Sequence, residues 1–67
     1  MTKKQKNLVK TCVSLVEKYL PYTNIKESIK SALIDVGVYL SYNPKSEFWQ
    51  EVKNMLDRQL LRTNLTQ

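Results

Sequence analysis

The sequence predicts an all-α protein, a compact three-helix bundle in which consecutive helices run antiparallel. Three observations lead to this prediction. Apolar residues recur every three or four positions in three stretches, about 3–20, 24–42 and 44–62, with polar residues between them. Proline and asparagine, which often end or start helices, separate the stretches. Both connections are short, so each helix should fold back against the one before it.

The first helix should span about 3–20. Its apolar positions are Leu8, Val9, Cys12, Val13, Leu15, Val16, Tyr19 and Leu20. Thr2 and Gln5 have the spacing of a capping box, which supports a start at residue 3. Lysines near that end oppose the helix dipole, so residues 1–7 are expected to form a basic N-terminal arm that frays. Pro21 closes the helix, because the residue before a proline avoids the helical conformation.

The second helix should span about 24–42, with Asn24 as its cap and Glu27 three residues later. Its apolar face consists of Ile25, Ile29, Ala32, Leu33, Val36, Tyr39 and Leu40. An alternative takes residues 36–42 as a strand, because valine and tyrosine favour strands and Gly37 weakens a helix by roughly 1 kcal/mol. A lone strand would have no pairing partner elsewhere in the chain, so the helix is favoured.

The third helix should span about 44–62, with Asn43 as cap and Pro44 at its first position. A later start at Ser46 and Glu47 is the alternative. Its apolar stripe consists of Phe48, Trp49, Val52, Met55, Leu56, Leu60 and Leu61. Residues 63–67 are expected to form a frayed C-terminal tail.

The segments YLPYTN at 19–24 and YLSYNP at 39–44 lie twenty residues apart, and the residues before them repeat the same apolar positions. Either an internal duplication or two helices of equal length joined by equal loops explains this echo. The tyrosines are interpreted as helix terminators, each ring against the end of the bundle with its hydroxyl toward water.

At 67 residues the chain should form one domain, residues 1–67. A chain this short buries only about 60% of the surface that its unfolded form exposes, so its core is marginal. One cysteine excludes an internal disulfide, and the absence of histidine excludes the usual zinc sites. Self-association or a partner protein is the remaining usual source of stability at this size.

The sequence offers little for catalysis. Without histidine there is no histidine-activated nucleophile, Cys12 lies on the expected core face, and one glycine cannot form a phosphate-binding loop. The acidic residues are spread among basic ones on all three helices. We therefore expect no enzyme, no cofactor, no metal and no small-molecule substrate. A single reduced cysteine without an export signal indicates a cytoplasmic protein, and no apolar run is long enough to cross a membrane.

The net charge of +5 comes mainly from the first ten residues, through Lys3, Lys4, Lys6 and Lys10. The rest of the chain is close to neutral. A lysine-rich arm can hold DNA or RNA phosphates, so nucleic-acid binding is the alternative function. The same arm gives little support for membrane binding, because the apolar face of its helix carries no Trp or Phe.

The second helix has a further apolar face. Ile34, Gly37, Val38 and Ser41 lie opposite its core-facing residues, and residues 36–42 carry no charge. Tyr42, at the end of this uncharged stretch, completes the candidate interface. Such a stripe is either ordinary surface or an interface that another chain covers. The favoured prediction is a non-catalytic protein-protein interaction module, an adaptor, inhibitor or regulator, that forms a homodimer through this stripe or binds another protein there.

Overall fold

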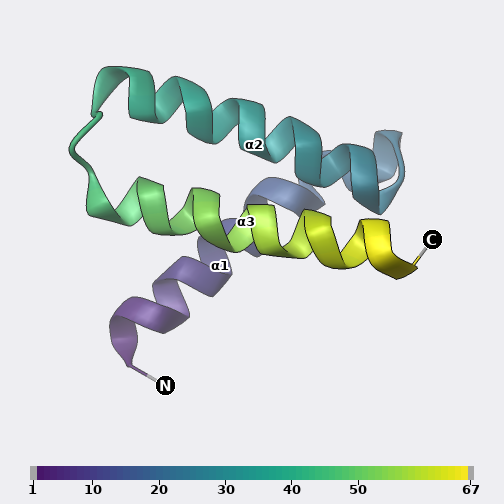
Figure 1. Ribbon diagram of the computed structural model, residues 1–67, viewed down its shortest axis with the longest axis horizontal. Helices are drawn as coiled ribbons and strands as arrows, with labels where there is room; N and C mark the ends of the chain where they lie inside the picture. The colour runs from purple at the N-terminus through teal and green to yellow at the C-terminus, as the bar shows by residue number, and fades with distance from the viewer. Residues whose placement is uncertain (1, 67) are drawn as a thin grey trace.

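The computed structural model describes residues 2–66 and is a three-helix bundle, as the sequence predicts. Its elements are α1 (Lys3–Glu17), the short 3-10 helix η1 (Leu20–Tyr22), α2 (Ile25–Tyr42) and α3 (Glu47–Thr66), and there is no strand within residues 2–66. Helices α2 and α3 lie side by side and antiparallel, and α1 crosses behind α3 (Figure 1). The radius of gyration is 11.8 Å, close to the roughly 11 Å of a compact chain of this length.

The capping box predicted at the start of α1 is present. The Thr2 hydroxyl accepts the Gln5 N–H at 3.2 Å, and the Gln5 side chain accepts the Thr2 N–H at 3.0 Å. Two of the otherwise unpaired amides of the first turn are thereby satisfied. The expected arm, residues 1–7, is therefore no separate segment, since residues 3–7 form the first turns of α1; Met1 lies outside the described residues.

Helix α1 ends at Glu17, three residues before the predicted end at 20. Pro21 has no N–H to donate to the Glu17 carbonyl, and its ring disfavours the α conformation in the residue before it. The chain tightens instead into η1, in which the Tyr22 N–H donates to the Tyr19 carbonyl at 3.0 Å. This turn directs the chain back into α2.

Helix α2 follows the prediction closely. The Asn24 side chain accepts the Glu27 N–H at 2.9 Å, and the helix continues without interruption to Tyr42. Residues 36–42 are helical, so the strand alternative is wrong. The hydroxyl of Ser28, a fully buried residue, donates to the Asn24 carbonyl at 2.8 Å, which leaves its polar atom satisfied.

Helix α3 differs from the prediction at both ends. Asn43 closes α2, with its N–H on the Tyr39 carbonyl at 2.9 Å, so it is not the cap of α3. The alternative start is correct: α3 begins at Glu47, and the Ser46 hydroxyl accepts the Trp49 N–H at 3.3 Å. The helix continues to Thr66, so residues 63–66 of the expected tail are its last turn; Gln67 is not described.

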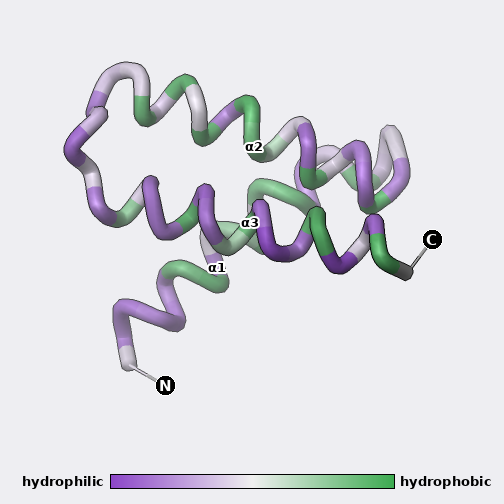
Figure 2. Tube along the Cα trace, in the orientation of Figure 1, coloured by the Kyte–Doolittle hydropathy of each residue, from purple (hydrophilic) through white to green (hydrophobic). Residues whose placement is uncertain are grey.

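The core is small and lies between the three helices. Its buried members are Leu8, Cys12, Ile29, Ala32, Val36, Val52 and Leu56. Half-buried residues, among them Phe48 and Trp49, pack around it. Trp49 stacks on Tyr39 with ring centroids 4.5 Å apart, which closes the bundle at the α2–α3 turn. Hydrophobic and hydrophilic segments alternate along every helix (Figure 2), as expected for helices that each bury one face.

Candidate interaction surfaces

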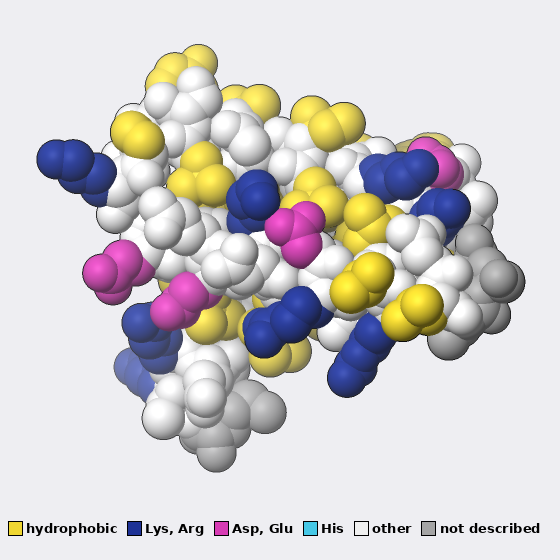
Figure 3. Space-filling view, in the orientation of Figure 1, with side chains coloured by type: hydrophobic (Ala, Val, Ile, Leu, Met, Phe, Trp, Pro, Cys, Tyr) yellow, Lys and Arg dark blue, Asp and Glu magenta, His cyan; other side chains and the backbone are white. Residues whose placement is uncertain are grey.

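The α2 stripe consists of Ile34, Gly37, Val38, Ser41 and Tyr42, and all five are exposed. Ile34 is 69%, Val38 50% and Tyr42 80% exposed. Ile34, Val38 and Ser41 lie on the side of α2 opposite Ala32 and Val36, which are fully buried, and Tyr42 lies at the edge of that side. Hydrophobic side chains follow the edge of the molecule formed by α2 (Figure 3). The structure thus brings together the residues that the sequence selected as an interface.

The centre of the α2 stripe is open to another backbone. A Cβ atom added to Gly37 would have no neighbour within 4 Å. Asp35, the nearest acidic residue in the sequence, is turned toward the end of α1. It accepts a hydrogen bond from Tyr19 and forms an ion pair with Lys18. A partner that packs on the stripe would therefore meet no charge between residues 36 and 42.

The sequence did not predict the polar contact between the end of α1 and α2. The Tyr19 hydroxyl donates to the Asp35 carboxylate at 2.6 Å, and the Lys18 ammonium lies 3.6 Å from the same oxygen. The hydrogen bond to Asp35 raises the pKa of the Tyr19 hydroxyl, and the negative charge of Asp35 raises the pKa of the Lys18 ammonium. Tyr19 therefore anchors α1 to α2 through a hydrogen bond.

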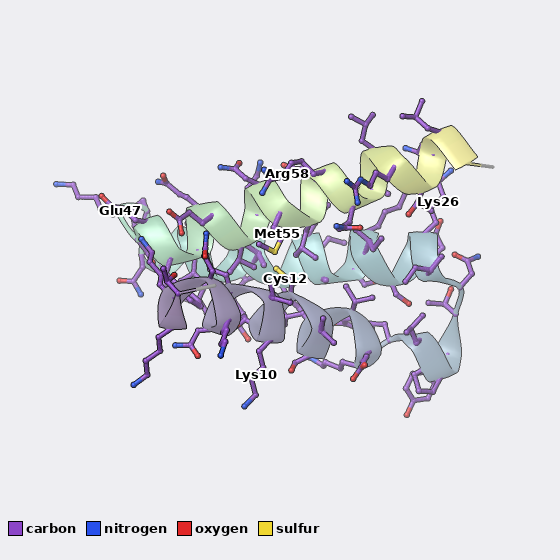
Figure 4. All side chains as sticks on the ribbon, turned by 90° about the horizontal axis from the view of Figure 1, so that it is seen from below. Lys10, Cys12, Lys26, Glu47, Met55 and Arg58 are labelled. Carbon is purple, nitrogen blue, oxygen red and sulfur yellow. The ribbon has the colours of Figure 1, made fainter. Side chains whose placement is uncertain are left out.

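The four lysines assigned to the N-terminal arm are dispersed over α1. Lys4 pairs with Glu51 of α3 at 3.5 Å, so part of its charge is compensated. Lys3, Lys6 and Lys10 are exposed, and Lys10 points away from the bundle (Figure 4). Arg58 of α3 lines the same surface hollow as Lys4, which adds a cation that the sequence had not associated with the arm.

A second apolar surface, the α1–α3 groove, was not predicted. Val9, Val13, Val16 and Leu20 line one side, and Met55 and Leu56 of α3 line the other, around a volume of about 460 Å³. The sequence placed Val9 and Val13 in the core, but they are 41% and 45% exposed. Helical spacing identified the apolar face of α1 correctly, but α3 does not cover the whole of that face.

Cys12 lies at the bottom of this groove and is buried. Its Sγ atom is 3.9 Å from the Val52 carbonyl, and burial raises the pKa of the thiol. A protonated, buried thiol is a poor nucleophile and behaves as packing material. Among the described residues, no cluster of three or more His, Cys, Asp and Glu side chains could hold a metal ion.

Comparison with known proteins gives no relative for this chain. No protein-family model, no curated protein and no solved structure matches it. Across residues 2–66, none of the helices combines the length and the apolar character that a membrane span requires. The features of the molecule that bear on its function are the two apolar surfaces and the distribution of charge.

Proposed function

We propose that this protein is a non-catalytic protein-protein interaction module that forms a homodimer through the α2 stripe and acts as an adaptor, inhibitor or regulator. The observation that carries the proposal is the exposure of Ile34, Val38 and Tyr42 on a face of α2 that holds no charge from residue 36 to residue 42. Three large apolar side chains in one continuous row are a common sign of a covered surface.

A second copy of the chain suits this stripe. In a two-fold dimer the same residues meet from both sides, so an apolar row on one copy meets an apolar row on the other. If two α2 helices cross near Val38, Gly37 and Ser41 allow close approach of the backbones, and the end with Ile34 packs against the end with Tyr42 of the second copy. Dimer formation also adds buried apolar area to a core with few fully buried members.

The test is the oligomeric state of the purified protein by sedimentation equilibrium. The wild type should be a dimer, and Val38→Glu should raise the dissociation constant at least about tenfold, because the new carboxylate would be buried without a partner. Ile34→Glu should act in the same way. Leu65→Glu is the matched control, because Leu65 is 78% exposed but lies on α3, away from the stripe. Circular dichroism should show unchanged helix content in all three variants.

A wild type that stays monomeric at high concentration would overturn the homodimer. Equal dissociation of the Leu65→Glu control would show that the stripe is not the interface. A gel shift at two salt concentrations tests the alternative, DNA or RNA binding through Lys3, Lys4, Lys6 and Lys10. A monomer with strong, salt-sensitive binding that is lost when Lys3, Lys4 and Lys6 are replaced by Gln would favour that alternative.

A further inference from the structure

We propose that α1 is a lid: it swings away as a unit about residues 20–23 while α2 and α3 stay paired. Each opening exposes the Cys12 thiol, together with the apolar sides of α2 and α3 that pack against α1 in the closed bundle. The lid goes beyond the proposed function, because α1 contributes no residue to the α2 stripe. The two can therefore be tested separately.

The core is packed more tightly between α2 and α3 than against α1. Val36 of α2 is 0% exposed, and Val52 and Leu56 of α3 are 0% and 1% exposed. The two core residues of α1, Leu8 and Cys12, are each 6% exposed, which is more than the core residues of the other two helices. Separating α1 from the pair therefore exposes less fully buried apolar surface than separating α2 from α3.

Aromatic contacts hold α2 and α3 together without help from α1. The rings of Tyr39 and Trp49 stack with their centroids 4.5 Å apart, and Phe48 meets Trp49 edge to face at 5.3 Å. All three rings belong to α2 or α3, near the turn that joins the two helices. These contacts therefore stay intact when α1 leaves, and they oppose separation of the remaining pair.

Polar contacts fasten α1 near its two ends. At the first end the Lys4 ammonium lies 3.5 Å from the Glu51 carboxylate, and the two side chains are 60% and 43% exposed, so this ion pair adds little stability. Just after α1 the Tyr19 hydroxyl donates to the Asp35 carboxylate at 2.6 Å. This hydrogen bond to a charged acceptor is the stronger contact, and it has to break when α1 swings away.

The segment between α1 and α2 allows one helix to move without the other. Helix α1 ends at Glu17, and α2 begins only at Ile25. Between them Pro21 has no N–H to donate, and the Thr23 N–H lies 3.4 Å from the Leu20 carbonyl, which is a long hydrogen bond. Rotation of the backbone in residues 20–23 therefore breaks no hydrogen bond of either α-helix.

Cys12 reports the opening directly, because its side chain lies between α1 and α3 (Figure 4) and is buried in the closed bundle. In the open state its thiolate attacks a chromogenic disulfide reagent, forms a mixed disulfide and releases a coloured thiolate. The labelling rate at increasing urea gives the free energy and the urea slope of the opening. Labelling should be at least about tenfold faster than global unfolding by circular dichroism allows, with a smaller urea slope.

Amide hydrogen exchange of the wild type locates the opening without any substitution. Amides of α1, such as that of Cys12, should be at least about tenfold less protected than those of Val36 and Val52. This measurement keeps the proposal testable if a variant fails to fold.

Three variants separate the opening of α1 from global unfolding. Tyr39→Leu removes a stack that persists in the open state, so it should lower the free energy of global unfolding and leave the labelling rate of Cys12 unchanged. Tyr19→Phe removes the hydrogen bond to Asp35 and should raise the labelling rate several-fold. Tyr22→Phe is the matched control, because it removes the hydroxyl of a side chain that is 87% exposed, and it should label as the wild type does.

Labelling of Cys12 with the free energy and urea slope of global unfolding would overturn the lid, because α1 would then leave only when the whole bundle unfolds. Equal protection of the amides in all three helices would have the same meaning. So would a Tyr39→Leu variant whose labelling rises in step with its loss of global stability. The same measurements in Val38→Glu should show an unchanged opening, so a monomeric wild type would refute the homodimer and leave the lid standing.

Discussion

Single polar contacts hold the ends of this bundle in place. The Tyr19 hydroxyl donates to the carboxylate of Asp35, sixteen residues later, at 2.6 Å. Its apolar neighbours on α1 pack against the core instead. Tyr22 and Tyr42, the second tyrosines of the two Tyr-Leu-x-Tyr segments, are 87% and 80% exposed. The interpretation that they pack against the bundle ends is therefore wrong for these two, and the four tyrosines differ in role although the sequence repeats.

The contact between Tyr19 and Asp35 predicts a loss of stability at alkaline pH. The folded-state pKa values of Tyr19 and Lys18 are both raised. Protons are therefore held more tightly in the folded state, so the stabilisation is complete below the ordinary pKa values of about 10 and is lost as the pH rises through the folded-state pKa values. Urea unfolding between about pH 8 and pH 11 should show this decrease in the free energy of unfolding.

Tyr19→Phe is the control for that prediction. It keeps the ring but removes the titrating hydroxyl, so its stability should fall less steeply with pH. Some decrease should remain, because Asp35 still raises the pKa of Lys18 and burial raises the pKa of Cys12. An identical pH dependence in the two proteins would show that the contact does not contribute.

Within α2, Gly37 should affect both the stability of the helix and the association of two copies of the chain. An alanine there would meet no atom within 4 Å and should stabilise α2 by about 0.5–1 kcal/mol, since glycine is a poor helix residue. In the proposed dimer the same methyl group would lie between two backbones and weaken association. We therefore expect Gly37→Ala to raise the urea midpoint in a monomeric Val38→Glu background and to raise the dimer dissociation constant in the wild-type background.

Ser41→Ala is the comparison for Gly37→Ala, because it lies on the same stripe and also creates an alanine. It gains less helix propensity than the glycine replacement and adds no atoms to the interface. If Gly37→Ala left the dimer unaffected, α2 helices would not pack closely at that position.

Local patterns in the sequence predicted the helices of this fold better than they predicted how the helices contact one another. The caps at Thr2 and Asn24 were predictable because each depends on residues three positions apart. The start of α3 was ambiguous, since Asn43 suits the end of α2 as well as the beginning of a new helix. The α2 stripe could be read from periodicity. The α1–α3 groove could not, because periodicity shows which face of a helix is apolar and not how much of it a crossing helix covers.

The two apolar surfaces of the bundle do not overlap. The α2 stripe faces away from the core, while the α1–α3 groove has α2 residues only at its base and one end. A dimer formed through α2 therefore leaves both grooves accessible.

The thermal stability of this protein should depend on its concentration. Among residues 2–65, seven apolar residues form the buried core, and domains of this size are only marginally stable. Association that favours the folded state stabilises it further by mass action, so the midpoint of thermal unfolding should rise with protein concentration. We expect a rise of several degrees over a hundredfold range of concentration by circular dichroism, and none for Val38→Glu. A wild-type midpoint that does not change with concentration would mean that folding is independent of self-association, and the small core would then be sufficient on its own.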